Sequence, residues 1–237
     1  MNHEFQNSLE ITVYGNHAVE AALSSERCSV KELWSKEPLE GVRSTLTSRQ
    51  ELDRKAGTDR HQGIVAKVQV KIWGQIEDWQ EERAPHVKGA LRVLAMDGIE
   101  DPQNLGALMR SAHFFGFHAV MFPKDRSAQL NGTSAKASTG AFAEVDIIRC
   151  TNISRELMSA EKLAFWRIGL KPDSPVFQKP EVLKNRPVIL VVGSEGEGMR
   201  RNVEDKCDEL VSIPSVSGRE SLNASVAGGI AMYVYRS

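Results

Sequence analysis

The segment from Val188 to Val192 constrains the fold of this chain most strongly. It reads Val-Ile-Leu-Val-Val, an apolar and mostly β-branched run without polar alternation. Such a run is typical of a central strand that is buried on both faces of a parallel sheet. Neighbouring parallel strands need crossover connections, which are usually helices. We therefore expect an α/β fold in which strands alternate with helices.

The second half of the chain shows this alternation throughout. Apolar runs of strand length are separated by segments with helical periodicity, which indicates a parallel sheet. We predict one domain over residues 91–237. Its expected strands cover residues 91–96, 119–122, 145–148, 165–169, 188–192 and 210–213, and its expected helices cover 105–115, 134–139, 153–163, 201–207 and 222–235.

The first 72 residues show a second, smaller α/β pattern. Asn16 and Ser48 are of the residue types that cap helices, and each precedes a segment with helical periodicity. We predict helices over 17–23 and 48–56 and strands over 11–13, 30–34, 42–46 and 63–70. Residues 73–90 are acidic, contain Pro85 and Gly89 and lack sustained periodicity, so we predict a linker there.

The composition is that of an ordinary globular protein. The chain has 237 residues, of which 41% are hydrophobic and 26% charged, and its formal net charge is -1. A near-neutral total argues against a protein that coats nucleic acid through general positive charge. A neutral total still allows local basic clusters, namely Lys124 with Arg126, and Arg200 with Arg201.

The sequence shows no pattern for export, membrane insertion or metal binding. The three cysteines, Cys28, Cys150 and Cys207, are widely spaced and form no zinc or disulfide pattern. The N-terminal residues lack an apolar signal region, and no apolar run approaches the roughly 20 residues that cross a bilayer. The six histidines show no paired ligand spacing. We expect a cytoplasmic protein without membrane association and without a metal ion.

Ligands of open parallel sheets bind beyond the carboxyl ends of the strands, so the loops at those ends are the candidate sites. After the strand at 91–96, Asn104 is expected to cap the helix that carries Arg110, with Pro102 keeping the loop before it non-helical. After the strand at 188–192 come Gly193, Glu195 and two further glycines. Taken singly, each loop also has a purely structural interpretation. The first can be a capped helix that carries a solvated arginine, and the second can be a tight turn between a strand and a helix.

The third loop follows the strand that ends at Ile213. Pro214 is followed by a segment rich in serine and glycine, and a helix of small residues then begins near Leu222. Gly228 and Gly229 inside that helix cost stability. They are expected where another helix packs closely, as it does at a dimer contact. A loose terminal helix is the alternative interpretation.

Together the three loops resemble the signature motifs of the SpoU/TrmH branch of the SPOUT RNA methyltransferases. The matching stretches are Asp101-Pro-Gln-Asn-Leu-Gly-Ala-Leu-Met-Arg-Ser-Ala112, Gly193-Ser-Glu-Gly-Glu-Gly198 and Ile213 to Ala227. Members that methylate a guanosine ribose in 23S ribosomal RNA also share Pro123 to Asn131, Glu195 to Arg201 and His61-Gln-Gly-Ile64. Ser215 and Ser217 stand where the family usually has methionine and glycine.

The resemblance implies a fold and a reaction. The expected fold is a parallel-sheet SPOUT domain with a C-terminal trefoil knot, preceded by an RNA-binding domain similar to ribosomal protein L30e that is shortened at Ser35 to Glu40. The expected activity is methylation of a ribose 2'-hydroxyl, most simply of a guanosine in 23S ribosomal RNA, by a homodimer that uses S-adenosylmethionine. Methylation of tRNA and a non-catalytic role as an RNA-binding or assembly factor are the alternatives.

The resemblance also assigns residues to roles. The catalytic positions are Asn104, Arg110, Glu195, Ser221 and Asn223, and the methyl-donor positions are Gly193, Gly198, Ile213, Pro214 and Leu222. A guanidinium stays protonated in proteins, so we expect Arg110 to stabilise negative charge or to position phosphate rather than to remove a proton.

Overall fold

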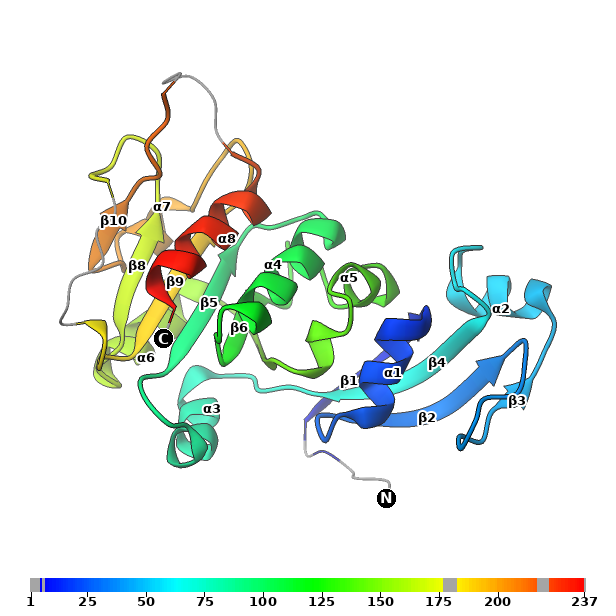
Figure 1. Cartoon of the computed structure of the whole chain (residues 1–237). Helices are drawn as coiled ribbons and strands as arrows, with labels where there is room; N and C mark the ends of the chain where they lie inside the picture. Colours follow the sequence, from blue (N-terminus) through cyan, green and yellow to red (C-terminus); the bar gives the residue numbers. More distant parts are fainter. Residues whose placement is uncertain (1–4, 6, 177–182, 217–221, 237) are drawn as a thin grey trace.

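The computed structural model describes residue 5 and residues 7–176, 183–216 and 222–236, which form two sheets (Figure 1). The larger sheet confirms the predicted parallel architecture, since its six strands run parallel in the order β10-β8-β9-β5-β6-β7. Its strands are β5 (Arg92–Asp97), β6 (Ala119–Pro123), β7 (Asp146–Cys150), β8 (Trp166–Leu170), β9 (Val188–Gly193) and β10 (Glu209–Val211).

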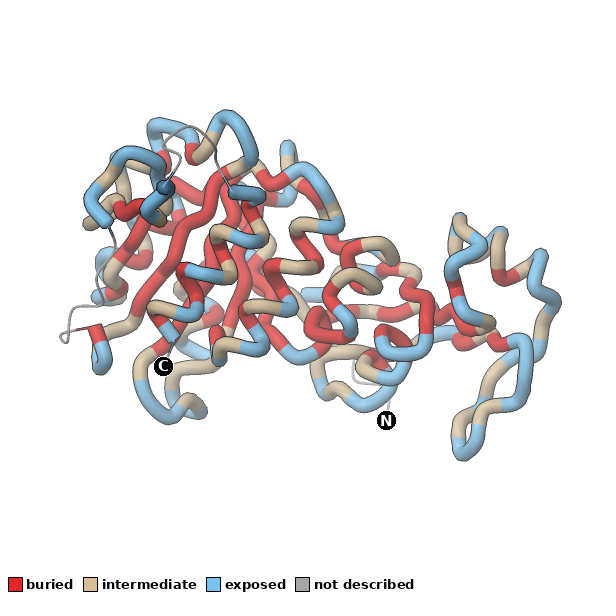
Figure 2. The backbone as a smooth tube through the Cα atoms, turned by 45° about the horizontal axis from the view of Figure 1, so that its top comes forward, coloured by how far each residue is buried: buried red, intermediate tan, exposed pale blue. Residues whose placement is uncertain are grey.

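The apolar run that forms β9 lies inside this sheet between β8 and β5, and each of its residues is buried (Figure 2). Alternate side chains enter two separate apolar clusters, as the twofold period of a strand requires. Leu190 and Val192 belong to one cluster, while Ile189 and Val191 belong to the other. A strand that is covered on both faces has no solvent face, which explains the absence of polar residues from this run.

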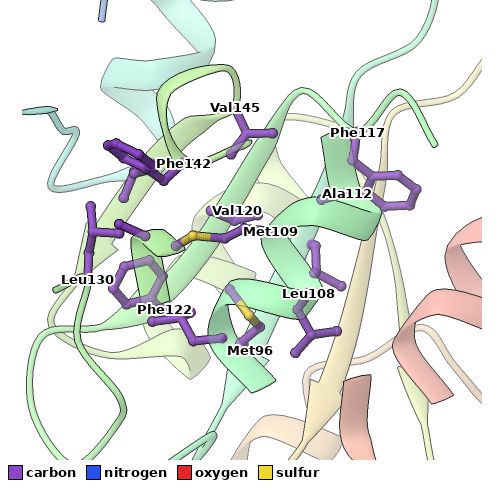
Figure 3. Close-up of a cluster of buried hydrophobic side chains, with 14 of the residues drawn as sticks. Met96, Leu108, Met109, Ala112, Phe117, Val120, Phe122, Leu130, Phe142 and Val145 are labelled. Carbon is purple, nitrogen blue, oxygen red and sulfur yellow. The ribbon is translucent and has the colours of Figure 1, made fainter. Parts of the chain in front are cut away.

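Helices cover both faces of the larger sheet. They are α4 (Pro102–Phe114), α5 (Gly132–Ala137), α6 (Ile153–Lys162), α7 (Arg201–Glu204) and α8 (Ala224–Tyr235), with the short 3-10 helix η2 (Ala141–Ala143). Helices α4 and α8 pack against each other over one face, where Leu108 and Met109 of α4 meet Met96 and Phe122 of the strands (Figure 3). Helix α6 covers the opposite face through Ile153 and other residues of the second cluster.

The smaller sheet is mixed. Its order is β1-β4-β2-β3, with β1 (Ser8–Tyr14), β4 (Ile64–Lys71), β2 (Cys28–Ser35) and β3 (Thr45–Leu46). Strands β1 and β2 pair antiparallel with β4, and β3 pairs parallel with β2. Helices α1 (Asn16–Ser24) and α2 (Arg49–Ala56) complete this part of the chain. The strand predicted over 42–46 is reduced to its last two residues.

Two predicted helix caps, Asn104 and Asn16, are wrong. Helix α4 begins at Pro102 and is capped by Asp101, whose side chain accepts from the backbone N–H of Gln103 at 2.8 Å. Proline is favoured at a first helical position because the N–H that it lacks has no partner there. Asn104 is therefore inside the first turn and is not the cap. Helix α1 begins at Asn16, and Gly15 is its capping residue.

Residues 73–90 contain two helical segments, α3 (Ile76–Arg83) and the 3-10 helix η1 (Ala84–His86). Trp73, Ile76 and Trp79 of this segment are buried in the second apolar cluster. The backbone N–H of Ile76 donates to the Glu156 carboxylate of α6 at 2.9 Å. The segment between the two sheets is therefore packed against the larger sheet.

One buried carboxylate joins the two parts of the molecule. Asp146 of β7 is only 2% exposed and accepts from Arg27 at 2.6 Å, from Arg83 at 2.8 Å and from the Trp79 indole at 3.0 Å. Arg27 belongs to the smaller α/β part, and the other two donors lie in α3. A buried charge with several donors has a strongly preferred geometry, so this joint fixes the orientation of the two sheets.

In the described part of the chain, no helix is both long enough and apolar enough to span a membrane. Among the same residues, no group of three or more His, Cys, Asp or Glu side chains is placed to hold a metal ion. The knot expected from the resemblance stays a prediction.

Candidate functional site

The candidate site lies at the carboxyl ends of the neighbouring strands β5 and β9. Register places Asp97, the last residue of β5, opposite Gly193, the last residue of β9. The loops that follow these two strands and the start of α8 enclose an open cavity of about 460 Å³. Its lining residues are Gly98, Ile99, Glu100, Asp101, Asn104, Ser194, Glu195, Glu197, Asn223 and Ala224.

Three of the predicted catalytic residues meet at this cavity. The Asn104 side-chain amide donates to Glu195 Oε1 at 2.8 Å, and the Asn223 amide donates to the same oxygen. Asn223 Nδ2 also lies 3.0 Å from Asn104 Oδ1, and the backbone N–H of Ala224 lies 3.4 Å from Glu195 Oε1. We call Asn104, Glu195 and Asn223 the amide–carboxylate triangle.

The triangle holds one oxygen of Glu195 and leaves the other open. Oε1 accepts from two side-chain amides and one backbone N–H. Within the residues that the structure describes, no donor to Oε2 is seen. Glu195 is exposed at the tip of its loop. The arrangement therefore presents a carboxylate oxygen of fixed orientation to whatever enters the cavity.

Asn223 performs two tasks with its two polar atoms. Its Oδ1 caps α8 by accepting from the backbone N–H of Ser225 at 2.9 Å and of Val226 at 3.3 Å. This satisfies N–H groups that have no partner within the helix. Its Nδ2 is left to donate to the other members of the triangle. Capping therefore fixes the rotation of the amide that contacts Glu195.

A tight hairpin carries Glu195. Ser194 and Gly198 exchange backbone hydrogen bonds of 3.1 Å in both directions. A Cβ atom on Gly193 would lie 2.2 Å from the carbonyl carbon of Gly198, so only glycine permits this return of the chain. Gly196 and Gly198 have φ values of 84° and 70°, which favour glycine. The glycines predicted as donor positions thus shape the turn.

Asp97 at the end of β5 holds the residue that follows the hairpin, and the sequence motifs did not single it out. Its side chain is fully buried and accepts from the backbone N–H of Arg200 at 2.8 Å and from Arg200 Nε at 2.9 Å. The ion pair raises the pKa of Arg200, chiefly through the hydrogen bond to Asp97. The position of Asp97, an acidic residue at the end of an apolar strand, could have indicated this role.

Arg110 is not part of the triangle. It is exposed on α4, and within the described residues it makes no hydrogen bond or ion pair.

The predicted donor residues beyond β10 lie at or near the surface. Ile213 is half-buried just beyond β10, and Pro214 and Leu222 are exposed. Ser221 lies outside the described residues, as does Ser217. The structure therefore brings together Asn104, Glu195 and Asn223, and leaves Arg110 at the surface.

An exposed apolar surface extends along α4 and α8 beside the site. Phe114 is 79% exposed and Tyr233 is 55% exposed, and the ring of Phe115 makes edge contacts with both. Val226 and Ile230 extend this surface along α8. We call these five residues the α4–α8 surface. Gly228 faces inward instead, since a Cβ atom there would lie 2.4 Å from Leu108 of α4.

Two family models match the chain. The SpoU rRNA Methylase family model matches residues 91–233. The model for RNA 2'-O ribose methyltransferase substrate binding matches residues 12–71.

Curated relatives match over almost the whole chain. The 23S rRNA (guanosine-2'-O-)-methyltransferase RlmB of Photorhabdus laumondii is 38% identical over 93% of this chain and 95% of that protein. The enzyme of the same name from Escherichia coli is 38% identical over 93% of this chain and 96% of that protein.

Solved structures share the fold. The SpoU methyltransferase AviRb of Streptomyces viridochromogenes, in complex with AdoMet, has a TM-score of 0.79 at 21% identity and covers 95% of this chain and 89% of its own. An AdoMet-bound rRNA methyltransferase of Sinorhizobium meliloti has a TM-score of 0.78 at 19% identity, covering 95% and 86%.

The capping role of Asn223 can be tested by stability. Asn223→Ala should lower the free energy of unfolding by about 1 kcal/mol, because the first turn of α8 loses its acceptor. Asn223→Ser should restore most of this loss, since a serine oxygen can cap the helix but cannot replace the donating amide. Urea denaturation of both variants measures the difference. Equal stability of Asn223→Ala and the unaltered chain would contradict the capping role.

Proposed function

Because the chain belongs to the SpoU rRNA methylase family, we propose that it methylates the ribose 2'-hydroxyl of a guanosine in 23S ribosomal RNA, with S-adenosylmethionine as methyl donor. The larger part of the chain matches the SpoU rRNA Methylase family model, and the N-terminal part matches the model for RNA 2'-O ribose methyltransferase substrate binding. Relatives with this activity in their names align over 93% of the chain. The observation that carries the proposal is the amide–carboxylate triangle, which combines three of the five predicted catalytic residues at the carboxyl edge of the sheet.

The residues beyond β9 and β10 fit a methyl donor of this kind. On Gly196 and Gly198, the position that a Cβ atom would take has no atom of a more distant residue within 4 Å, so a ligand can approach their backbone closely. Leu222 is 46% exposed and offers an apolar contact, and Pro214 is exposed beside Ile213. We propose that Gly193, Gly198, Ile213, Pro214 and Leu222 hold the donor mainly through backbone groups. When bound, S-adenosylmethionine supplies a methyl group on a positively charged sulfur, which leaves as a neutral thioether.

Glu195 is suited to receive the hydroxyl proton. A ribose 2'-hydroxyl must lose its proton as its oxygen forms the bond to the methyl carbon. Oε1 is held by the two amides, so Oε2 can accept the hydrogen bond of the hydroxyl and then the proton. A fixed acceptor aligns the attacking oxygen, and alignment of reacting groups can lower a barrier by about 7–11 kcal/mol. Asn104 and Asn223 act here as positioning residues.

Arg110 is suited to bind the negative charge of the RNA. Its guanidinium stays protonated, and it has no partner among the described residues, so it is free to contact a phosphate or the developing charge on the ribose oxygen. It precedes Phe114 by four residues, which places both on one face of α4. Arg110 therefore borders the α4–α8 surface.

We propose that the α4–α8 surface joins two copies of the chain. Exposed aromatic and aliphatic side chains that gather on one face mark a protein interface. In a twofold dimer the same surface occurs on both partners, so each copy would bury the Phe114 and Tyr233 of the other. Arg110 would then lie at the boundary of the two copies.

Dimerisation can be tested with Phe114→Glu, which places a charge at the most exposed aromatic of this surface. We expect the unaltered chain to be dimeric and the variant monomeric, because burying an unpaired charge in an interface is costly. Light scattering coupled to size exclusion measures the mass. Met158→Glu is the matched control, since Met158 is 48% exposed on α6 at the other face of the sheet. A monomeric unaltered chain would contradict the dimer.

The role of Arg110 can be tested with Arg110→Ala. The variant should bind S-adenosylmethionine with unchanged affinity but lose about 100-fold in turnover, the size of effect seen when one stabilising donor is removed. Calorimetry and methyl transfer to 23S ribosomal RNA measure the two quantities. Arg155→Ala, an exposed arginine on α6, is the control and should keep its activity. Turnover of Arg110→Ala within tenfold of the unaltered chain would remove Arg110 from the mechanism.

The substrate can be identified by mapping ribose methylation in cells that lack this protein. One 2'-O-methylguanosine of 23S ribosomal RNA should disappear and should return when the intact gene is supplied. The tRNA fraction of the same cells serves as the comparison. Loss of a methyl group from tRNA instead would support the tRNA alternative, and no change in either RNA would support a non-catalytic role.

A further inference from the structure

We infer that the groove between the N-terminal sheet and α5 binds the sugar–phosphate backbone of the RNA substrate beside the methylated nucleotide. This inference rests on the proposed function and adds a substrate site formed by both parts of the chain. The groove has a volume of about 750 Å³ and is larger than the cavity at the triangle. Its walls include Thr12 of β1, Arg60 of the α2–β4 loop, Lys136 of α5 and Gln103 of α4.

The groove borders the cavity at the triangle. Gln103 lines the groove, whereas Asn104, the next residue, and Asp101, two residues before Gln103, line the cavity. The first turn of α4 therefore borders both openings. An extended chain that occupies the groove and passes Gln103 arrives at Asn104. The groove is thus placed to hold nucleotides next to the one whose ribose enters the cavity.

The charges and polar groups of the groove fit the backbone of RNA. Arg60 and Lys136 supply two cations. Glu10 is the carboxylate of the lining, and it is already paired with Lys67 at 2.9 Å. The hydroxyl groups of Thr12, Thr58 and Thr133 add neutral donors and acceptors. Cations together with hydroxyls match phosphates and 2'-hydroxyls, which distinguish RNA as a ligand.

The lining argues against recognition by base stacking. Tyr14 is the aromatic residue of the lining, and it is 7% exposed, with its hydroxyl 3.3 Å from the hydroxyl of Thr133. A base needs an accessible aromatic face on which to stack. The groove therefore recognises the sugar and phosphate groups of a strand, so its selectivity for sequence should be low.

The groove is formed before RNA binds. The Lys136 ammonium donates to the backbone carbonyl of Arg60 and lies 5.5 Å from the centre of the Tyr14 ring, which ties α5 to the N-terminal sheet. A Cβ atom on Gly132 would lie 2.4 Å from the Tyr14 ring, so the two parts are in close contact. The Asp146 joint holds them at a second point. A rigid groove spares the ordering cost of binding.

The test uses Arg60→Ala and Gln103→Ala in the full chain. The Arg60 carbonyl keeps its contact with Lys136 when the side chain is removed, so the groove stays intact. The control is Arg49→Ala, an exposed arginine on α2 that does not line the groove. The probe is an unmethylated 23S ribosomal RNA transcript, and the measurements are its dissociation constant over a range of salt concentrations and the steady-state kinetics of methyl transfer.

Arg60→Ala should weaken RNA binding about tenfold and reduce the slope of log affinity against log salt by about one, as loss of a phosphate contact does. Gln103→Ala should weaken binding less, with an unchanged slope, because a neutral group is removed. In both variants KM for RNA should rise while kcat at saturating RNA and the affinity for S-adenosylmethionine stay unchanged. Arg49→Ala should match the unaltered chain.

RNA affinity and salt slope equal to those of the unaltered chain in both groove variants would overturn the inference. A fall in kcat with unchanged RNA affinity would overturn it as well, since that pattern assigns the residues to the chemistry. Failure of the proposed function has a different signature, because the unaltered chain would then transfer no methyl group to any RNA. Binding of the transcript in the absence of donor tests the groove separately from the reaction.

Discussion

The pairing of β5 with β9 is the constraint on which the rest of the structure depends. Both strands are buried along their whole length, and six consecutive residue pairs join them in register. This register places Asp97 beside Gly193, and two loops of the candidate site start from these residues. A shift by one residue would move every side chain of a strand to the opposite face. Apolar packing on both faces of the sheet therefore fixes the positions at which the polar loops of the site begin.

Polar groups at the ends of these strands are ordered by contacts that also hold the fold. Asp97 is buried but neutralised by Arg200, which anchors the far side of the glycine hairpin. Asn223 caps α8 and at the same time holds Glu195. Buried or capping groups of this kind cost stability when they lose a partner. The loops of the site are thus held rigidly, because Asp97 and Asn223 also stabilise the fold.

The two sheets form a single unit through a small number of specific contacts. Asp146 collects donors from the N-terminal part and from α3, and Lys136 reaches from α5 to the Arg60 carbonyl. The apolar cluster on that face of the larger sheet continues into the smaller one, with Val13 and Val68 among its members. These contacts fix the orientation of the groove at Lys136 relative to the cavity at the triangle.

The sequence by itself determined the alternating α/β architecture, the central position of β9 and the residue types at three strand ends, because these depend on local periodicity and on motifs. The helix at 76–83 was decided by tertiary contacts, such as the burial of Trp79. The start of α4 is set locally by Asp101 and Pro102, at a position earlier than the motif led us to expect. The tertiary structure alone decided how the site is assembled. It brings Asn104, Glu195 and Asn223 together and leaves Arg110 apart from them. It also places Asp97 under the hairpin and forms the groove at Lys136. Asn104 and Asn223 lie 119 residues apart along the chain, and no local propensity acts over such a separation. Only the packing of α4 and α8 on the same face of the sheet brings them into contact.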